Sequence, residues 1–122
     1  MKSTHPLRLV RALYHSVAGF TALWRQEQAF RQEIYAAVIM LPVLYFLPII
    51  ALAKLVLIFL WWLLLIVETI NSSIEAVIDR ISLERHPQSK IAKDMGSAAV
   101  ALALIMNVGA WLYVLIPLFV RP

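Results

Sequence analysis

Residues 55–67 read LVLIFLWWLLLIV, an unbroken apolar run that continues directly into ETINSSIEAVID at residues 68–79. A helix that crosses a hydrocarbon core of about 30 Å needs roughly 20 residues at 1.5 Å each, so these thirteen apolar residues are too few to span a bilayer alone. Helical character can continue through the polar residues that follow. We therefore expect a membrane span over residues 55–81 that carries polar and acidic side chains in one half.

Two further segments are long enough to cross a membrane. Ile34–Ala53 is twenty residues without a charge, and Met95–Val120 is twenty-six. The whole chain of 122 residues is 62% hydrophobic and only 15% charged, against roughly 25% charged in soluble domains. The sequence predicts one all-α integral-membrane domain, residues 1–122, with spans at residues 34–53, 55–81 and 93–120. Prolines inside the apolar runs are expected to bend these helices without breaking them. They are Pro42, Pro48 and Pro117.

Residues 5–30 precede the first span, and their apolar side chains recur at helical spacing with basic residues elsewhere around the helix. This pattern predicts an amphipathic helix that lies along the cytoplasmic surface of the membrane. Five basic residues precede the first span, and four lie between residues 79 and 93, whereas Lys54 is alone in the first interhelical turn. The positive-inside rule then places the N-terminus and the second loop in the cytoplasm and the C-terminus outside. The five are Lys2, Arg8, Arg11, Arg25 and Arg31. Because topology accounts for the basic excess, we expect no nucleic-acid partner.

The acidic residues of the second span form a stripe. With Lys54 as the outer boundary, Glu68 lies about 21 Å inward and roughly 10 Å short of the cytoplasmic edge, and Glu75 lies at that edge. Seven residues turn a helix through about 700°, so the two carboxylates lie on one face, where Asp79 joins them and Asn71 and Ser72 flank them. A charged residue inside a span costs roughly 2.5–3.5 kcal/mol, which makes Glu68 a candidate functional group.

Several readings of this stripe are open from the residues alone. Asn71, Ser72 and Ser73 are also typical of interhelical hydrogen bonds that hold membrane helices together. Two carboxylates on one face need a cation or a proton between them, and Mg²⁺ shared with phosphate oxygens suits such a site. A small proton-coupled transporter would also use them, although transporters place the key carboxylate near the midplane with access from both sides. The three glycines allow neither a phosphate loop nor the glycine-rich loop of protein kinases.

Three segments together carry a recognisable pattern: EQAFRQE at residues 27–33, VETINSSIEAVIDRI at residues 67–81 and AKDMGSAAV at residues 92–100. They resemble the signature segments of the prokaryotic diacylglycerol kinase family. The resemblance implies a small multi-pass kinase of the bacterial inner membrane that moves the γ-phosphoryl group of MgATP to diacylglycerol. It implies a homotrimeric helical bundle in which each active site is lined by more than one subunit. An undecaprenol kinase of the same fold is the alternative, because the lipid pocket cannot be drawn from the sequence.

The resemblance also implies roles for individual positions. Glu68 matches the general base, and Glu27 and Glu75 match the carboxylates that hold Mg²⁺. The positions that it assigns to ATP and its metal are Arg8, His15, Glu27, Glu75, Glu84, Arg85, His86, Lys93 and Asp94. Those that it assigns to the lipid substrate, or near the transferred group, are Arg8, Ala29, Phe30, Arg31, Gln32, Glu33, Glu68, Asn71 and Ser97. At residue 15 the chain has histidine where a tyrosine is familiar in the family.

Overall fold

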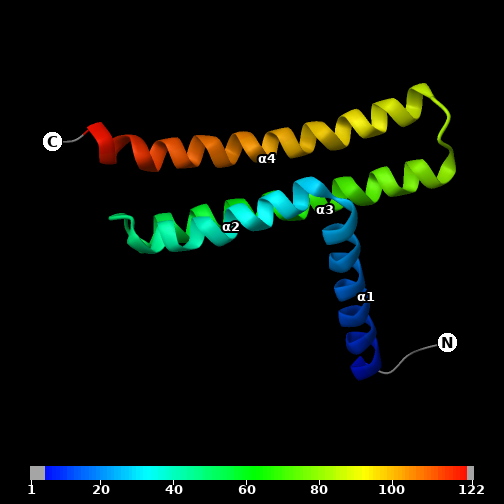
Figure 1. Ribbon diagram of the computed structural model, residues 1–122, viewed down its shortest axis with the longest axis horizontal. Coiled ribbons are helices and arrows are strands. Elements are labelled where there is room, and N and C mark those ends of the chain that lie inside the picture. The colour runs from blue at the N-terminus through cyan, green and yellow to red at the C-terminus, as the bar shows by residue number, and fades with distance from the viewer. Residues whose placement is uncertain (1–4, 121–122) are drawn as a thin grey trace.

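The computed structural model describes residues 5–120, which form four helices (Figure 1). Helix α1 spans His5–Gln26, α2 spans Gln28–Phe46, α3 spans Ala51–Ile81 and α4 spans Pro87–Val120. The last three are each long and apolar enough to cross a membrane. This confirms the expectation of an all-α membrane protein with an N-terminal helix and three spans. Lys2, one of the basic residues in the orientation argument, lies outside the described residues.

The helices α3 and α4 run antiparallel beside each other, α2 packs against α3, and α1 projects away from this bundle (Figure 1). At 1.5 Å per residue, the 31 residues of α3 and the 34 of α4 extend about 46 and 51 Å. Both helices are longer than a hydrocarbon core of about 30 Å. The ends of both helices where the chain passes from α3 to α4 can therefore extend beyond the hydrocarbon layer.

The α3 helix packs through a seam at seven-residue intervals. Leu57 and Leu64 are fully buried at 0% exposure, and Asn71 follows them on the same face at 8%. The facing helix α4 contributes small buried residues, Gly96 and Ala103. Small side chains let the backbones of membrane helices approach closely. The α3 and α4 helices are therefore in close contact along the same face that carries the acidic stripe.

The first interhelical turn corrects the expectation for Pro48. The first span was expected over residues 34–53, but α2 ends at Phe46 and α3 begins at Ala51, so this proline separates two helices. Leu47 has φ −69° and ψ 134°, the extended conformation favoured before a proline. Proline also lacks the N–H that would continue the helix. Pro42 and Pro117 lie inside α2 and α4, so the expectation that they do not break a helix is confirmed.

The other boundaries differ more mildly from the expected ones. The surface helix was expected over residues 5–30 but ends at Gln26, so residues 28–33 belong to α2. Pro87 is the first residue of α4, a favourable position because the N–H groups of a first helical turn have no partner in the helix. In the turn between α2 and α3, the Lys54 ammonium donates to the Tyr45 carbonyl at 3.1 Å and so caps the end of α2.

Candidate active site

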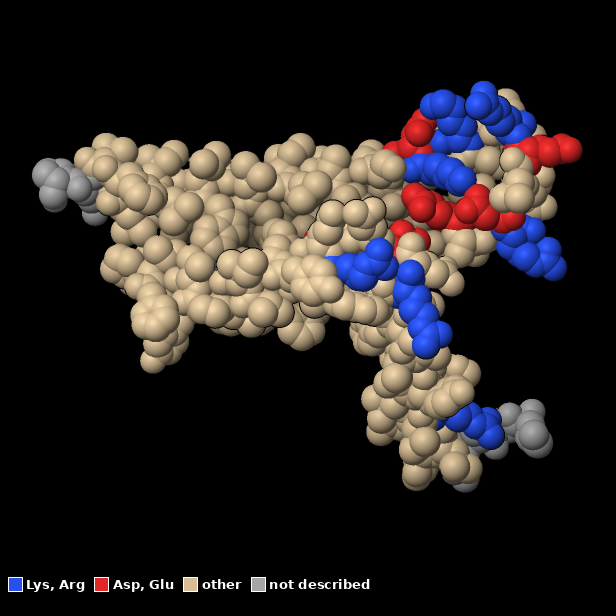
Figure 2. Space-filling model, in the orientation of Figure 1, with Lys and Arg blue, Asp and Glu red and all other residues tan. Residues whose placement is uncertain are grey.

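The polar stripe of α3 becomes more exposed from its centre to its C-terminal end. Glu68 is 6% exposed and Asn71 8%, Glu75 is half-buried, and Asp79 is exposed. On the face drawn in Figure 2, acidic and basic side chains gather at the end of the bundle where α3 meets α4, while the opposite end shows none. The most enclosed carboxylate of the stripe is therefore Glu68, which the distance along the helix from Lys54 had placed deepest in the span.

A cluster of carboxyl groups surrounds Glu68. Glu27, Glu33 and Glu75 are its acidic neighbours. Glu33 Oε1 is buried with no hydrogen-bond partner among residues 5–120. Glu33 was expected at the lipid, and the structure brings it to the candidate base as well.

The cluster is held by contacts between helices. The Trp61 indole Nε1 of α3 donates to the Glu33 carbonyl of α2 at 2.9 Å, which sets the height of α2 beside Glu68. The Arg31 guanidinium donates to the carbonyls of Trp24 at 2.6 Å and Arg25 at 3.2 Å. Arg31 thereby caps the end of α1 at its junction with α2. This role at the junction was not expected from the sequence, which assigned Arg31 to the lipid.

Glu27 and Glu75 line one cavity of about 480 Å³ between α1 and the C-terminal half of α3. Among residues 5–120 no three His, Cys, Asp or Glu side chains gather closely enough to hold a metal ion by themselves. Mg²⁺ is commonly bound by only one or two carboxylates together with substrate phosphates and water. Asp79 lines the same cavity, and such a cavity fits Mg²⁺ that arrives with a nucleotide, rather than a metal held by protein ligands alone.

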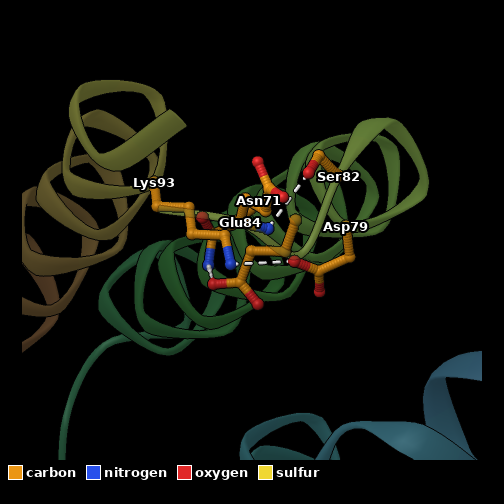
Figure 3. A network of polar contacts seen from close by, with 6 residues as sticks. Asn71, Asp79, Ser82, Glu84 and Lys93 are labelled. Atoms are coloured by element: carbon orange, nitrogen blue, oxygen red, sulfur yellow. Dashed lines mark hydrogen bonds and ion pairs between the residues drawn. The ribbon is translucent and has the colours of Figure 1, made fainter. Parts of the chain in front are cut away.

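A second cavity, of about 610 Å³, lies at the passage from α3 to α4. The residues expected at the nucleotide from this part of the chain all line it, and they are Glu84, Arg85, His86, Lys93 and Asp94. Lys93 reaches from α4 to Asp79 of α3, with Nζ 2.9 Å from Oδ1 (Figure 3). Asp79 lines both cavities, so this ion pair stands between them. Cationic and acidic groups thus meet at the border of the two cavities.

Some expected site residues lie apart from these cavities. Arg8 and His15 are exposed on α1 and line neither of them, although other residues of α1, such as Ser16 and Gly19, line the first cavity. Ser97 is exposed on α4 and also lines neither cavity. Ala29, Phe30 and Gln32 occupy the first turns of α2, where Phe30 is buried. The assigned roles of these positions remain predictions.

The sequence placed Asp79 and Ser72 on or beside the polar face of α3 but assigned neither of them to the site. Asp79 follows Glu75 by four residues on the same helical face, and this spacing was the available signal. Ser72 lines the first cavity, and its buried Oγ has no hydrogen-bond partner in the described part of the chain. Ser72 follows Glu68 by four residues and so flanks the polar face, whereas the neighbouring Ser73 lies off that face, is exposed and donates to the Ile70 carbonyl at 2.8 Å.

Comparison with known proteins adds independent findings. Residues 14–115 match the family described as prokaryotic diacylglycerol kinase. A protein of Pseudomonas aeruginosa named Diacylglycerol kinase is 46% identical over 109 residues, which cover 89% of each chain. A protein of the same name from Escherichia coli K12 is 44% identical over 104 residues, 85% of each chain. A third, from Haemophilus influenzae, is 36% identical over 110 residues, 90% of this chain and 93% of the relative.

Proposed function

Because the chain belongs to the prokaryotic diacylglycerol kinase family, and is therefore a lipid kinase, we propose that it phosphorylates diacylglycerol with ATP. The γ-phosphoryl group moves to the free hydroxyl of the lipid, the hydroxyl loses its proton, and the products are phosphatidic acid and ADP. The observation that carries this proposal is the carboxyl cluster around Glu68, which lies in a helix apolar enough to cross a membrane and whose members Glu27 and Glu75 line the first cavity.

Glu68 is the general base of the proposed reaction. Its side chain is nearly enclosed and belongs to a helix apolar enough to cross a membrane. The second cavity, at the loop between α3 and α4 (the loop cavity), is instead lined largely by exposed polar and charged residues. A diacylglycerol hydroxyl lies slightly below the lipid headgroups, so its base belongs at shallow depth. Phosphoryl transfer depends chiefly on in-line positioning and on neutralising negative charge. Glu68 orients the hydroxyl and accepts its proton.

The nucleotide occupies the side of the site formed by the loop and the start of α4. Glu27 and Glu75 would hold Mg²⁺, which when bound neutralises charge on the phosphate oxygens. The Lys93 ammonium adds a second positive charge to the same phosphates. Glu84, Arg85, His86 and Asp94 line the remaining wall of the loop cavity and contact the nucleotide.

The lipid and the membrane set the orientation of the protein. The start of α2, residues 29–33, lies beside the carboxyl cluster and contacts the lipid headgroup. ATP is cytosolic, so the N-terminus and the loop between α3 and α4 face the cytoplasm of a bacterium, and the C-terminus lies outside. Arg8 and His15 lie apart from the loop cavity within one chain. This separation supports a homotrimer in which α1 of one subunit completes the nucleotide site of another.

The test is a phosphorylation assay with purified protein in mixed micelles. Labelled ATP and Mg²⁺ are supplied with diacylglycerol in one reaction and undecaprenol in another, and a parallel reaction contains a chelator. We expect label in phosphatidic acid that depends on Mg²⁺. Preferential labelling of undecaprenol would overturn the proposed acceptor, and no labelling of either lipid would overturn the proposed reaction.

A further inference from the structure

Gly96 of α4 lies directly against the amide of Asn71 on α3. A Cβ atom added at Gly96 would overlap Asn71 Oδ1 and would lie 3.2 Å from Asn71 Cγ. The other two glycines, Gly19 and Gly109, have nothing within 4 Å of an added Cβ. No glycine in the described part of the chain has a positive φ angle. Gly96 is therefore required for the close approach of two helices and not for its backbone conformation.

The Asn71 amide is held between Gly96 and Glu75. Its Nδ2 donates to Glu75 Oε1 at 3.4 Å, one turn further along α3. Its Oδ1 is buried with no hydrogen-bond partner among the described residues, and it faces the backbone of Gly96. The polarised hydrogens of a glycine Cα can make weak C–H···O contacts with such an oxygen. An added side chain at residue 96 would push the amide away and move its donor relative to the Glu75 carboxylate.

We propose that Gly96 is a positioning residue for the metal site: by leaving space for the Asn71 amide, it sets the orientation of the Glu75 carboxylate towards Mg²⁺. The inference rests on the proposed function, in which Glu75 is a metal ligand. Groups that hydrogen-bond to ligating carboxylates orient them, and their loss commonly weakens metal binding by about 10- to 100-fold. Gly96 acts one step further out, through the amide that makes such a bond.

The experiment measures metal binding without turnover. Mn²⁺ replaces Mg²⁺, a non-hydrolysable ATP analogue supplies the phosphates, no lipid acceptor is added, and bound Mn²⁺ is determined by electron paramagnetic resonance. Gly96→Ala is expected to weaken Mn²⁺ binding by about tenfold or more. The matched control is Gly109→Ala, the same change on the same helix where there is open space, and it is expected to stay within about twofold of wild type.

Asn71→Ala separates action through Asn71 from a general packing defect. This substitution removes Oδ1 and Cγ but keeps Asn71 Cβ, which lies 3.9 Å from the added Cβ, an ordinary contact. Adding Gly96→Ala to the Asn71→Ala variant should therefore cause no further loss of Mn²⁺ binding. An equal loss from Gly96→Ala in both backgrounds would overturn the inference, as would wild-type binding by Gly96→Ala.

Two further measurements keep the result decisive. If Gly96→Ala alone does not fold, as judged by circular dichroism, the double variant should still fold as well as Asn71→Ala, and its failure to do so would overturn the inference. Glu75→Gln tests the underlying proposal: unchanged Mn²⁺ binding would overturn the role of Glu75 and this inference with it. Weakened binding by Glu75→Gln together with unchanged binding by Gly96→Ala would overturn this inference alone.

Discussion

Replacing Asn107 with leucine is expected to stabilise the protein, although this asparagine joins two helices. Asn107 lies on α4 at 3% exposure, and its Nδ2 donates to the Leu60 carbonyl of α3 and to the Ala103 carbonyl of its own helix, both at 2.9 Å. Its Oδ1 is buried with no hydrogen-bond partner among residues 5–120. The Asn107 side chain therefore makes one stabilising and one destabilising contribution to the free energy of folding.

These two contributions differ in magnitude. An interhelical hydrogen bond inside a membrane contributes about 0.6 kcal/mol on average and about 1.7 kcal/mol at most. A buried acceptor without a donor costs about 1–3 kcal/mol. Leucine branches at Cγ as asparagine does and removes both effects, and the Leu60 and Ala103 carbonyls lie within helices that provide their own N–H donors. The net expectation for Asn107→Leu is a gain of about 1 kcal/mol, roughly a fivefold shift of the unfolding equilibrium.

The assay is reversible unfolding in mixed micelles with increasing denaturing detergent, followed by tryptophan fluorescence and circular dichroism. Met106→Leu, a change at a half-exposed position on the same helix, serves as the control and is expected to leave the midpoint unchanged. If Asn107→Leu were less stable than wild type by about 1 kcal/mol, the reasoning would be refuted. Asn107 Oδ1 would then have a donor that one chain does not supply.

Three other substitutions test separate contacts. Trp61→Phe keeps an aromatic ring but removes the 2.9 Å hydrogen bond to the Glu33 carbonyl. It should lower the free energy of unfolding by about 0.6–1.7 kcal/mol in the same titration and slow lipid phosphorylation. Unchanged stability would contradict the role of this hydrogen bond. Asp79→Asn removes a negative charge from both cavities and frees Lys93 to bind phosphate, so a non-hydrolysable ATP analogue should bind more tightly in titration calorimetry. This gain in affinity should shrink as the salt concentration rises. Weaker binding would contradict the idea that Asp79 competes with the nucleotide phosphates for Lys93. Lys54→Met removes the cation that caps α2 and should cost about 0.3–1 kcal/mol of stability, which Lys54→Arg should recover if the charge is what matters.

The sequence predicted those features that depend on regular helical geometry. Glu68, Asn71 and Glu75 follow the period of a single helix, and their graded burial along α3 agrees with the expected stripe. The residues between 84 and 94 are close in the chain, so their common cavity also follows from local order. Composition and the lengths of the apolar segments were sufficient to predict the three helices that can cross a membrane.

The remaining features depend on which residues of different helices meet, and one sequence does not carry that information. Gly96 fits Asn71 only because α3 and α4 pack at one particular register, and the same register sets Asn107 against the Leu60 carbonyl. Pro48 was expected to bend a helix like Pro42 and Pro117, but it ends one. A proline is tolerated inside a membrane helix when neighbours satisfy the freed carbonyl, and that depends on the packing around each site.

The most direct test of the proposed chemistry is a single-turnover measurement with Glu68→Gln. The variant is mixed with labelled ATP, Mg²⁺ and diacylglycerol in micelles, and the rate of phosphatidic acid formation is compared with that of wild type. Circular dichroism and nucleotide binding are recorded first, to establish that the variant is folded and binds ATP. With the base removed, phosphoryl transfer should slow by about 100-fold or more while nucleotide binding is kept. A near-normal transfer rate would contradict the role of Glu68 as the base.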